Sequence, residues 1–526
     1  MRYGCAMRSF RPPMLVAAVL VLGGVALAFV VNRHQAPAPK PVSVAPVSPP
    51  QAAPAPKPAP PPPPAIDAAG AQGIVDGVHA MLASMLGALA PPTDLLQATA
   101  QGDHYHIEIP IAHRWKGGGI GGDSIGADLT PLGGGRWRIG NGAAPRRVEV
   151  SIDHPPQGMA SMTVMTAKDL SFSGVIDTTL ATPSSVAMHA ADENISGQGA
   201  QVGSGMHIDS ADGTLRLTPT QDGRATLVST STLKGLRTTS VVGKLATGSE
   251  AQRAVTSLRI VNLSLAELRA GLLAISTLAT LPQPPAAASP PDPAIRKQLH
   301  DLIAALATGA TSIALRESED GLVIHGPGPM QGAIGHLGFA MTFGEQDGTL
   351  SLALDIGLDK PSFPAIPSGT LAAFVPSHLV LQPRLAGIDA STLRQTLDAA
   401  VDNPGGSAFP SLVMTVLNAH PATIAIDRLA IDTGPAHITG HGTLTSSGPG
   451  NAQGTATVRA TGLDAAIKEL SADPQARQML AGLLFLKGLG KADGDAMVWD
   501  LAFDGHKLLV NGNDISALAP GVPAPH

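Results

Sequence analysis

The first 65 residues restrict what this chain can fold into more than any other feature. An unbroken apolar run without a charged residue extends from Met14 to Val31, and a proline tract follows from Ala36 to Ala65. Fourteen of the thirty residues in this tract are proline, so it cannot form a packed core and favours an extended polyproline II conformation. Any folded core must therefore come from the roughly 460 residues that follow.

The apolar run has about the minimum length of a helix that crosses a bilayer. Arg2, Arg8 and Arg11 precede it and Arg33 follows it, a bias that favours a cytoplasmic N-terminus and an exported remainder. We therefore expect a cytoplasmic segment at 1–13, a transmembrane anchor at 14–31 in a bacterial inner membrane, and a Pro-rich linker at 32–65. A signal peptide cleaved after Ala26-Leu27-Ala28 is the alternative, and both interpretations place the rest of the chain in the periplasm.

Composition limits both the core and the partners. Aromatic residues make up 3% of the chain and charged residues 14%, against about 25% charged residues in typical soluble domains. The core must therefore be built from aliphatic side chains. A net charge of −6 provides no basic surface, so we expect no nucleic-acid partner. The only cysteine, Cys5, precedes the apolar run, which excludes an intramolecular disulfide or a cysteine metal site beyond it.

Helical and strand periodicities alternate after the linker. Apolar residues recur at three- and four-residue steps in the predicted helices, with a capping-box pattern at Ser264 and Glu267. Strict alternation predicts short strands, and Gly-rich residues 117–126 predict a loop. Asp212-Gly213 and Asp222-Gly223 predict turns, and Asp504-Gly505 predicts the tip of a hairpin. The predicted helices are 71–90, 265–278, 294–307 and 391–401; the predicted strands are 104–111, 136–139, 147–152, 160–166, 170–176, 213–218, 224–230, 258–261, 312–316, 321–325, 338–343 and 350–354. Toward the C-terminus we predict a helical run at 412–417, an alternating strand from Ile424, a strand followed by a helix within 455–470, and two strands within 496–512.

A second Pro-rich stretch at 282–293 divides the remainder into two predicted β-rich domains, 66–281 and 294–526. A unit made of a helix end, a strand, an acidic turn and a second strand occurs at 302–328 and again, in similar form, at 412–442. Repetition of one such unit favours an elongated, layered β-structure. We therefore predict an α+β fold of elongated, twisted antiparallel β-sheets with amphipathic helices on one face.

Residues 411–512 contain LNAHPATIAIDRLAIDTGPAHITGHGTLT, TATVRATGLDAAIKEL and WDLAFDGHKLLVNG. This pattern of short helix, proline, alternating strand and acidic turn resembles the C-terminal part of YdgA-like proteins and, more broadly, the AsmA-like periplasmic proteins. The first are bacterial envelope proteins with one N-terminal membrane anchor, and the second are β-rich and associated with lipid handling. The resemblance implies a β-rich envelope protein and brings no catalytic residue with it.

Ser124 is the one candidate nucleophile, because Gly122–Gly126 fits the pattern G-x-S-x-G. A nucleophile elbow needs a buried strand before the serine and a helix after it. Glycines precede Ser124 and Pro131 follows it soon after, so the surroundings do not fit. The overlapping G-x-G-x-x-G at Gly117–Gly122 lacks the strand–turn–helix context as well. We therefore assign no catalytic residue and keep a Ser124-dependent hydrolase only as the least favoured alternative.

Histidines are the candidate metal ligands. His104 and His106 would share one face of a strand, as would His437 and His441. A zinc site would need a third ligand, such as His113 or Glu108. We interpret these residues as partly exposed strand histidines and expect neither a metal nor a cofactor.

Together these features predict a non-enzymatic envelope protein that binds a lipid or another apolar ligand or acts in envelope maintenance. The alternative is a protein-interaction scaffold that reaches a cell-wall or outer-membrane partner. A lipid-binding protein should show a continuous apolar face on its sheet, whereas an interaction module should show scattered apolar patches.

Overall fold

The computed structural model describes most of the chain from Ile66 onward. The described residues are 66–87, 90–115, 118–152, 161–177, 182–199, 202–220, 223–242, 245–280, 293–327, 331–363, 370–402, 421–446, 452–505 and 507–516. The predicted cytoplasmic segment, the anchor, the linker at 32–65, residues 282–292 of the second Pro-rich stretch and the segment 412–420 lie outside these ranges. Among the described residues, no helix is both long enough and apolar enough to span a membrane.

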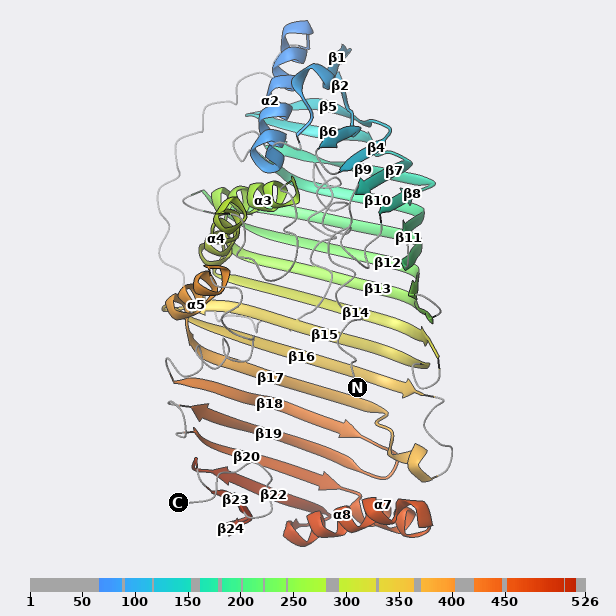
Figure 1. Cartoon of the computed structure of the whole chain (residues 1–526), viewed down its shortest axis with the longest axis vertical. Helices are drawn as coiled ribbons and strands as arrows, with labels where there is room; N and C mark the ends of the chain where they lie inside the picture. Colours follow the sequence, from blue (N-terminus) through green and yellow to red (C-terminus); the bar gives the residue numbers. More distant parts are fainter. Residues whose placement is uncertain are drawn as a thin grey trace, which may run out of the picture.

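The strands form one large antiparallel sheet, which confirms the predicted β-rich α+β class. All 24 described strands belong to it, and Figure 1 shows them stacked along the long axis of the molecule. They are β1 (Gln97–Gln101), β2 (His104–Ile109), β3 (His113–Trp115), β4 (Gly118–Gly122), β5 (Ile125–Gly133), β6 (Arg136–Ala143), β7 (Arg147–Ile152), β8 (Met162–Thr166), β9 (Asp169–Asp177), β10 (Thr182–Gln198), β11 (Val202–Pro219), β12 (Arg224–Val242), β13 (Leu245–Ser264), β14 (Ser312–His325), β15 (Gly332–Gln346), β16 (Thr349–Ser362), β17 (His378–Asp389), β18 (Ala422–Asp432), β19 (His437–Ser446), β20 (Ala452–Thr461), β21 (Lys491–Asp493), β22 (Ala496–Phe503), β23 (Leu508–Val510) and β24 (Asn513–Asp514).

From β10 to β20 each strand pairs with the next one in the chain. The N-terminal end continues from β10 through β9, β6, β5 and β2 to β1. The C-terminal end continues from β20 through β22 and β23 to β24. The hairpin predicted at Asp504-Gly505 is confirmed, because β22 pairs with β23 across it.

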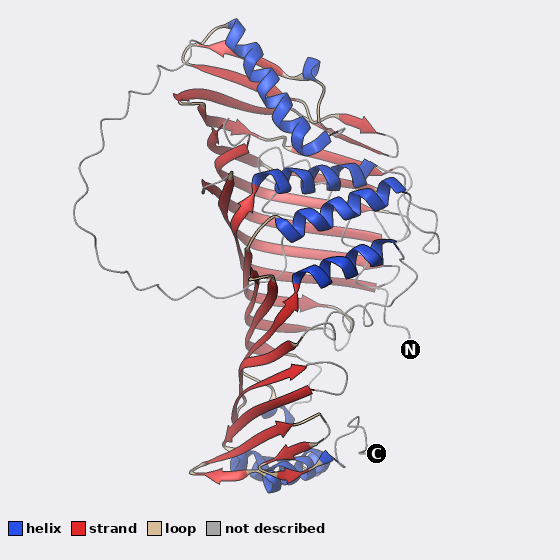
Figure 2. Cartoon of the chain, turned by 90° about the vertical axis from the view of Figure 1, so that its left-hand side faces the viewer, coloured by secondary structure: helices blue, strands red, loops and turns tan. Residues whose placement is uncertain are grey.

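Four helices lie side by side over one face of the sheet: α2 (Ala68–Leu86), α3 (Leu265–Thr280), α4 (Pro293–Thr308) and α5 (Ala390–Asp402) (Figure 2). All four were predicted from their periodicity. The predicted N-cap of α3 is confirmed, because the Glu267 backbone N–H donates to Ser264 Oγ at 3.3 Å. Leu265 of α3 is buried with Leu227, Leu258 and Leu315 of the strands, so this face of the sheet carries the core. Two further helices, α7 (Leu463–Ser471) and α8 (Arg477–Leu489), lie at the C-terminal end of the sheet.

The predicted division at 282–293 falls within this sheet. Strands β13 and β14 lie on either side of it in the chain, and they pair from Gly248↔His325 to Val261↔Ser312. Helices α3 and α4 also pack on each other. The segments 66–281 and 294–526 therefore share a sheet and a helical layer.

A straight row of residues crosses seven neighbouring strands, β10 to β16, and we name it the crease. By register it consists of Asp192, Asp209, Gly235, Gln252, Gly321, Gly335 and Lys360. Every second member has a positive φ: Asp192 at 51°, Gly235 at 61°, Gly321 at 62° and Lys360 at 49°. Left-handed backbone in mid-strand bends the strand, so a row of such residues folds the whole sheet along one line.

In the N-terminal part of the sheet, the line of the crease falls where the strands are interrupted completely. Strands β8 and β9 pair with β10 on the two sides of Asp192, as one strand interrupted at Ala167-Lys168. In the same way β6 and β7 are separated by 144–146, and β4 and β5 by Asp123-Ser124. The loop predicted at 117–126 is therefore wrong for most of its length, because 118–122 and 125–133 are strands.

Along each strand the side chains that face the core recur at every second residue, but the step across the crease is three residues. The buried residues step from Ala211 to Ile208 in β11 and from Ala254 to Ala251 in β13. This change explains two wrong predictions. The acidic turn predicted between 312–316 and 321–325 is the crease inside the single strand β14, and strands β11 to β13 were predicted far too short. The turn predicted at Asp212-Gly213 is also wrong, because both residues lie within β11.

Helices α4 and α5 are joined by a histidine between two carboxylates. Nδ1 of His300 lies 2.7 Å from Asp398 and Nε2 lies 3.0 Å from Asp402. Arg394 lies 3.7 Å from Asp398, and Arg296 lies 4.0 Å from Asp402. The hydrogen bond with Asp398, followed by that with Asp402, raises the pKa of His300 above its ordinary value of 6.5.

The raised pKa means that folding strengthens proton binding at His300. The stabilisation is therefore complete below about pH 6.5 and is lost as the pH rises through the folded-state pKa. We expect His300→Gln to be less stable than the wild type at about pH 6 and to differ less from it at about pH 8.5. Urea unfolding of both proteins at the two pH values measures this, and an equal difference at both would contradict it.

Candidate functional site

The side of the sheet that carries the core is also the inner side of the bend that the sheet makes at the crease. Ile208, on one side of the crease, clusters with Ala211 and Leu233 on the other side. In β14 and β15, Leu322 and Ile334 likewise pack with Leu337 and Leu358 across it. Because apolar side chains from the two sides meet, we name this side of the sheet the inner face.

Toward the C-terminal end the inner face is lined almost continuously by aliphatic side chains, and we name this region the aliphatic section. One row runs directly across five strands, since Leu337 lies opposite Leu358, which lies opposite Leu379, and the row ends at Ile431 and Ile438. A second row is formed by Leu352, Leu385, Ile424 and Leu444. The aliphatic section consists of Leu337, Phe339, Met341, Leu352, Leu354, Ile356, Leu358, Leu379, Leu381, Leu385, Ile424, Ile426, Leu429, Ile431, Ile438 and Leu444.

This section is open to solvent where the row of helices has ended. Helix α5 follows β17 directly in the chain, and in Figure 2 the strands beyond it extend past the helices. Ile424 is 44% exposed and Ile426 is 40% exposed, and the residues of the row from Leu337 to Ile438 are all half-buried. A contiguous apolar surface of this kind is unusual on a soluble protein unless it binds something.

The opposite face carries a ladder of acids and histidines. Asp320, His336, Asp359, His378, Asp432 and His437 lie directly opposite one another across the six strands β14 to β19. Nδ1 of His336 lies 2.7 Å from Oδ1 of Asp320, and His378 and His437 contact Asp359 and Asp432 in the same way. The two faces of β15–β19 therefore differ sharply: one is aliphatic and the other carries a ladder of hydrogen-bonded Asp and His side chains.

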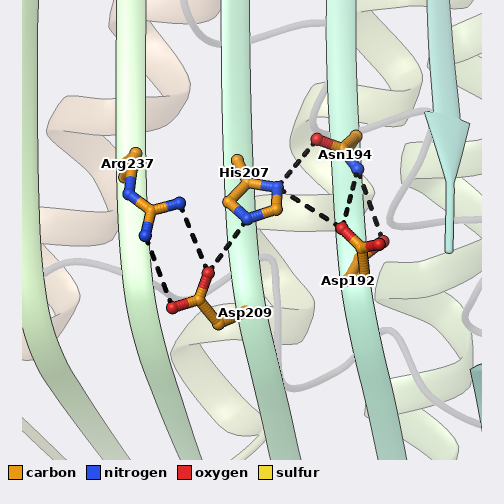
Figure 3. Close-up of polar contacts among 5 residues, drawn as sticks. All are labelled: Asp192, Asn194, His207, Asp209 and Arg237. Atoms are coloured by element: carbon orange, nitrogen blue, oxygen red, sulfur yellow. Dashed lines mark hydrogen bonds and ion pairs between the residues drawn. The ribbon is translucent and has the colours of Figure 1, made fainter. Parts of the chain in front are cut away.

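A second polar group lies at the crease on this outer face (Figure 3). His207 lies between two acceptors, with Nδ1 2.8 Å from Asn194 Oδ1 and Nε2 3.0 Å from Asp209 Oδ1. Asp209 also contacts Arg237 at 3.3 Å. These side chains connect three strands across the bend, but their exposure limits each contact to a modest contribution.

Ser124 does not have the surroundings of a nucleophile. It lies at the break between β4 and β5, so a strand follows it where an elbow would need a helix. The side chain is exposed. Within the described part of the chain, it forms no hydrogen bond with a histidine or a carboxylate. The pattern G-x-S-x-G is explained by its position, since Asp123 and Ser124 are where the crease interrupts a strand.

His104 and His106 of β2 converge on Asp128 of β5. His106 Nδ1 lies 2.8 Å from Asp128 Oδ1, and His104 Nε2 lies 3.8 Å from the same atom. Hydrogen bonds from His106 and then Asn141 hold the pKa of Asp128 below its ordinary value. Glu108 lies 3.9 Å from His106, and the side chain of His113 lies outside the described part of the chain. Among the described residues, no three His, Cys, Asp or Glu side chains are arranged to hold a metal ion.

One residue of the inner face, Glu193 in β10, was not predicted from the sequence. It is only 6% exposed, and burial raises its pKa to about 7. The segment Ala191–Asn194 looks like a polar turn in the sequence, which hid its inward position. The signal that could have revealed it is the step from Ala190 to Glu193, the same three-residue step that the neighbouring strands make at the crease.

Comparisons with protein-family models, with curated proteins and with solved structures gave no match. The function of this chain must therefore be inferred from its own geometry.

Proposed function

We propose that this protein is a non-catalytic component of the bacterial envelope that binds the acyl chain of a lipid on the aliphatic section of its sheet. The N-terminal apolar run would hold it in the inner membrane, and the proline tract would extend it into the periplasm. The single observation that carries the proposal is the half-exposed aliphatic lining of β15–β19, with a ladder of Asp and His side chains on the opposite face.

The chemistry of that lining suits an acyl chain. It consists of Leu, Ile, Met and Phe side chains without a hydrogen-bonding group. It can therefore bind an apolar molecule but cannot recognise a particular arrangement of polar groups. Each methylene that leaves water for such a surface contributes about 0.8 kcal/mol. Two acids, Glu317 and Glu319 of β14, mark the N-terminal limit of the purely aliphatic region.

Lipid retained by the full-length protein tests this function. We expect native mass spectrometry of the chain in mild detergent to show bound lipid, and the variant Leu379→Glu to lose most of it. The matched control is Val380→Glu, which adds the same charge to the opposite face of β17 and should keep the lipid. Equal lipid content in all three proteins, or none in the wild type, would contradict the proposal.

An interaction scaffold is the second candidate, because α8 presents large apolar side chains to solvent. Leu484, Phe485 and Leu486 are 50%, 53% and 51% exposed, at the C-terminal end of the sheet. This patch is separate from the aliphatic section and would suit a protein partner. A photo-crosslinker at Phe485 that captures a protein, with no lipid captured at Leu358, would favour this function over the first.

A further inference from the structure

Glu193 is a buried acid placed among the apolar residues that line the inside of the crease. By register its row consists of Glu193, Ile208, Leu236, Ala251, Leu322 and Ile334, on six neighbouring strands. Ile208, directly opposite Glu193, is 0% exposed, and Ala190, three residues earlier on the same strand, is 1% exposed. Five of the six positions in the row are therefore apolar, and the sixth is a carboxylic acid.

Within the described part of the chain, the Glu193 carboxyl has no hydrogen-bond or ion-pair partner. Burial is the sole cause of its raised pKa of about 7, so no charged group acts on it. Burying a carboxylate without a partner is costly, more so than burying an uncharged polar group. A leucine or methionine at this position would avoid that cost, so folding alone does not account for an acid here.

The carboxyl nevertheless reaches accessible space. Among the described residues, Arg296 Nε is the only fully enclosed side-chain nitrogen or oxygen without a partner, so the unpartnered Glu193 oxygens are not fully enclosed. The half-buried side chains of Ile195 and Met206, which lie opposite each other, are the next inward pair of β10 and β11. An apolar surface with one accessible acid beside it is the arrangement that an amphiphile fits.

We infer that Glu193 binds the polar end of the ligand, and that this end carries a primary amine. The inference rests on the proposed function, because it assigns a head group to a lipid whose chain extends from Glu193 on β10 along the inner face toward the aliphatic section, across five strand spacings of about 4.8 Å. An ammonium group would supply the positive charge that the site lacks, and would donate hydrogen bonds to both carboxyl oxygens. A hydrogen bond between charged groups contributes about 1.5–3 kcal/mol, which corresponds to roughly tenfold or more in affinity.

The test uses the full-length chain in membrane vesicles and three photoreactive probes. Each probe carries the same diazirine-bearing acyl chain, and they differ only in ending with a primary amine, a hydroxyl or a carboxylate. We expect the amine probe to label peptides of β10–β12 at least about tenfold more than the carboxylate probe. Glu193→Leu should remove this preference while keeping labelling by the chain, and its melting temperature should not fall. Glu319→Gln, which changes another acid on the inner face, should leave the preference intact.

The outcomes test the head-group assignment separately from the proposed function. Equal labelling of the wild type by all three probes would refute the role of Glu193 and leave lipid binding standing. A preference that survives in Glu193→Leu would refute it as well. If no probe labels the inner face of any variant, both the head-group assignment and the proposed function are wrong.

Discussion

Leu315→Ala should lower the free energy of unfolding by about 2–5 kcal/mol, the range for a leucine removed from a closed core. Leu315 is 1% exposed and clusters with residues of β11, β12, β13 and α3. The loss should therefore extend to elements that precede the Pro-rich stretch 282–293. Hydrogen exchange of the full-length chain should show faster exchange in α3 and β12 as well as in β14.

The matched control is Leu245→Ala, the same change at a leucine of the same sheet that is 60% exposed. It should alter stability by no more than about 0.5 kcal/mol. A Leu315→Ala protein in which α3 and β12 exchange at wild-type rates would show that the two sides of 282–293 are energetically independent. That result would overturn the description of one core shared across the predicted domain boundary.

Gly235→Val should cost about 2–3 kcal/mol, because Gly235 lies on the crease with a φ of 61°. A β-branched side chain strongly disfavours this left-handed conformation. A Cβ atom at this position would also overlap the carboxylate of Asp209. The strain therefore has two sources, one in the backbone and one in the neighbouring strand.

Gly203→Val provides the comparison for this prediction. Gly203 lies in β11, and a Cβ there would meet its nearest neighbour, Val241 Cβ, at 4.0 Å. We expect its melting temperature to stay close to that of the wild type, since valine suits an extended strand. Equal loss of stability in both variants would mean that the left-handed backbone of the crease has no special role.

The helices could be predicted because their signals are local. α3 shows this most clearly, since its apolar steps, its capping serine and its acidic third residue all lie within one short stretch. The tip of the hairpin between β22 and β23 was predictable for the same reason. What could not be predicted was the length of β10–β14, because the crease changes the alternation within each strand. A residue such as Gly321 is a turn signal locally, and only pairing with both neighbouring strands shows that the strand continues through it.

The candidate site was harder to predict from the sequence than the fold was. The aliphatic rows join residues as distant as Leu337 and Ile438, and no single segment displays them together. The ladder of Asp and His residues is hidden in the same way, because each strand contributes one member. The convergence of His104 and His106 was predictable from their spacing, but their partner Asp128 was not, because it lies on another strand.

Site-specific photo-crosslinking in living cells tests the central claim most directly. A benzophenone amino acid is placed at Leu358 on the aliphatic section, and in a second protein at Val380 on the opposite face of the adjacent strand. We predict ultraviolet-dependent lipid adducts, identified by mass spectrometry, at Leu358 and none at Val380. Adducts of equal yield at both positions, or an absence of lipid at Leu358 when the protein is folded and correctly located, would contradict lipid binding on the inner face.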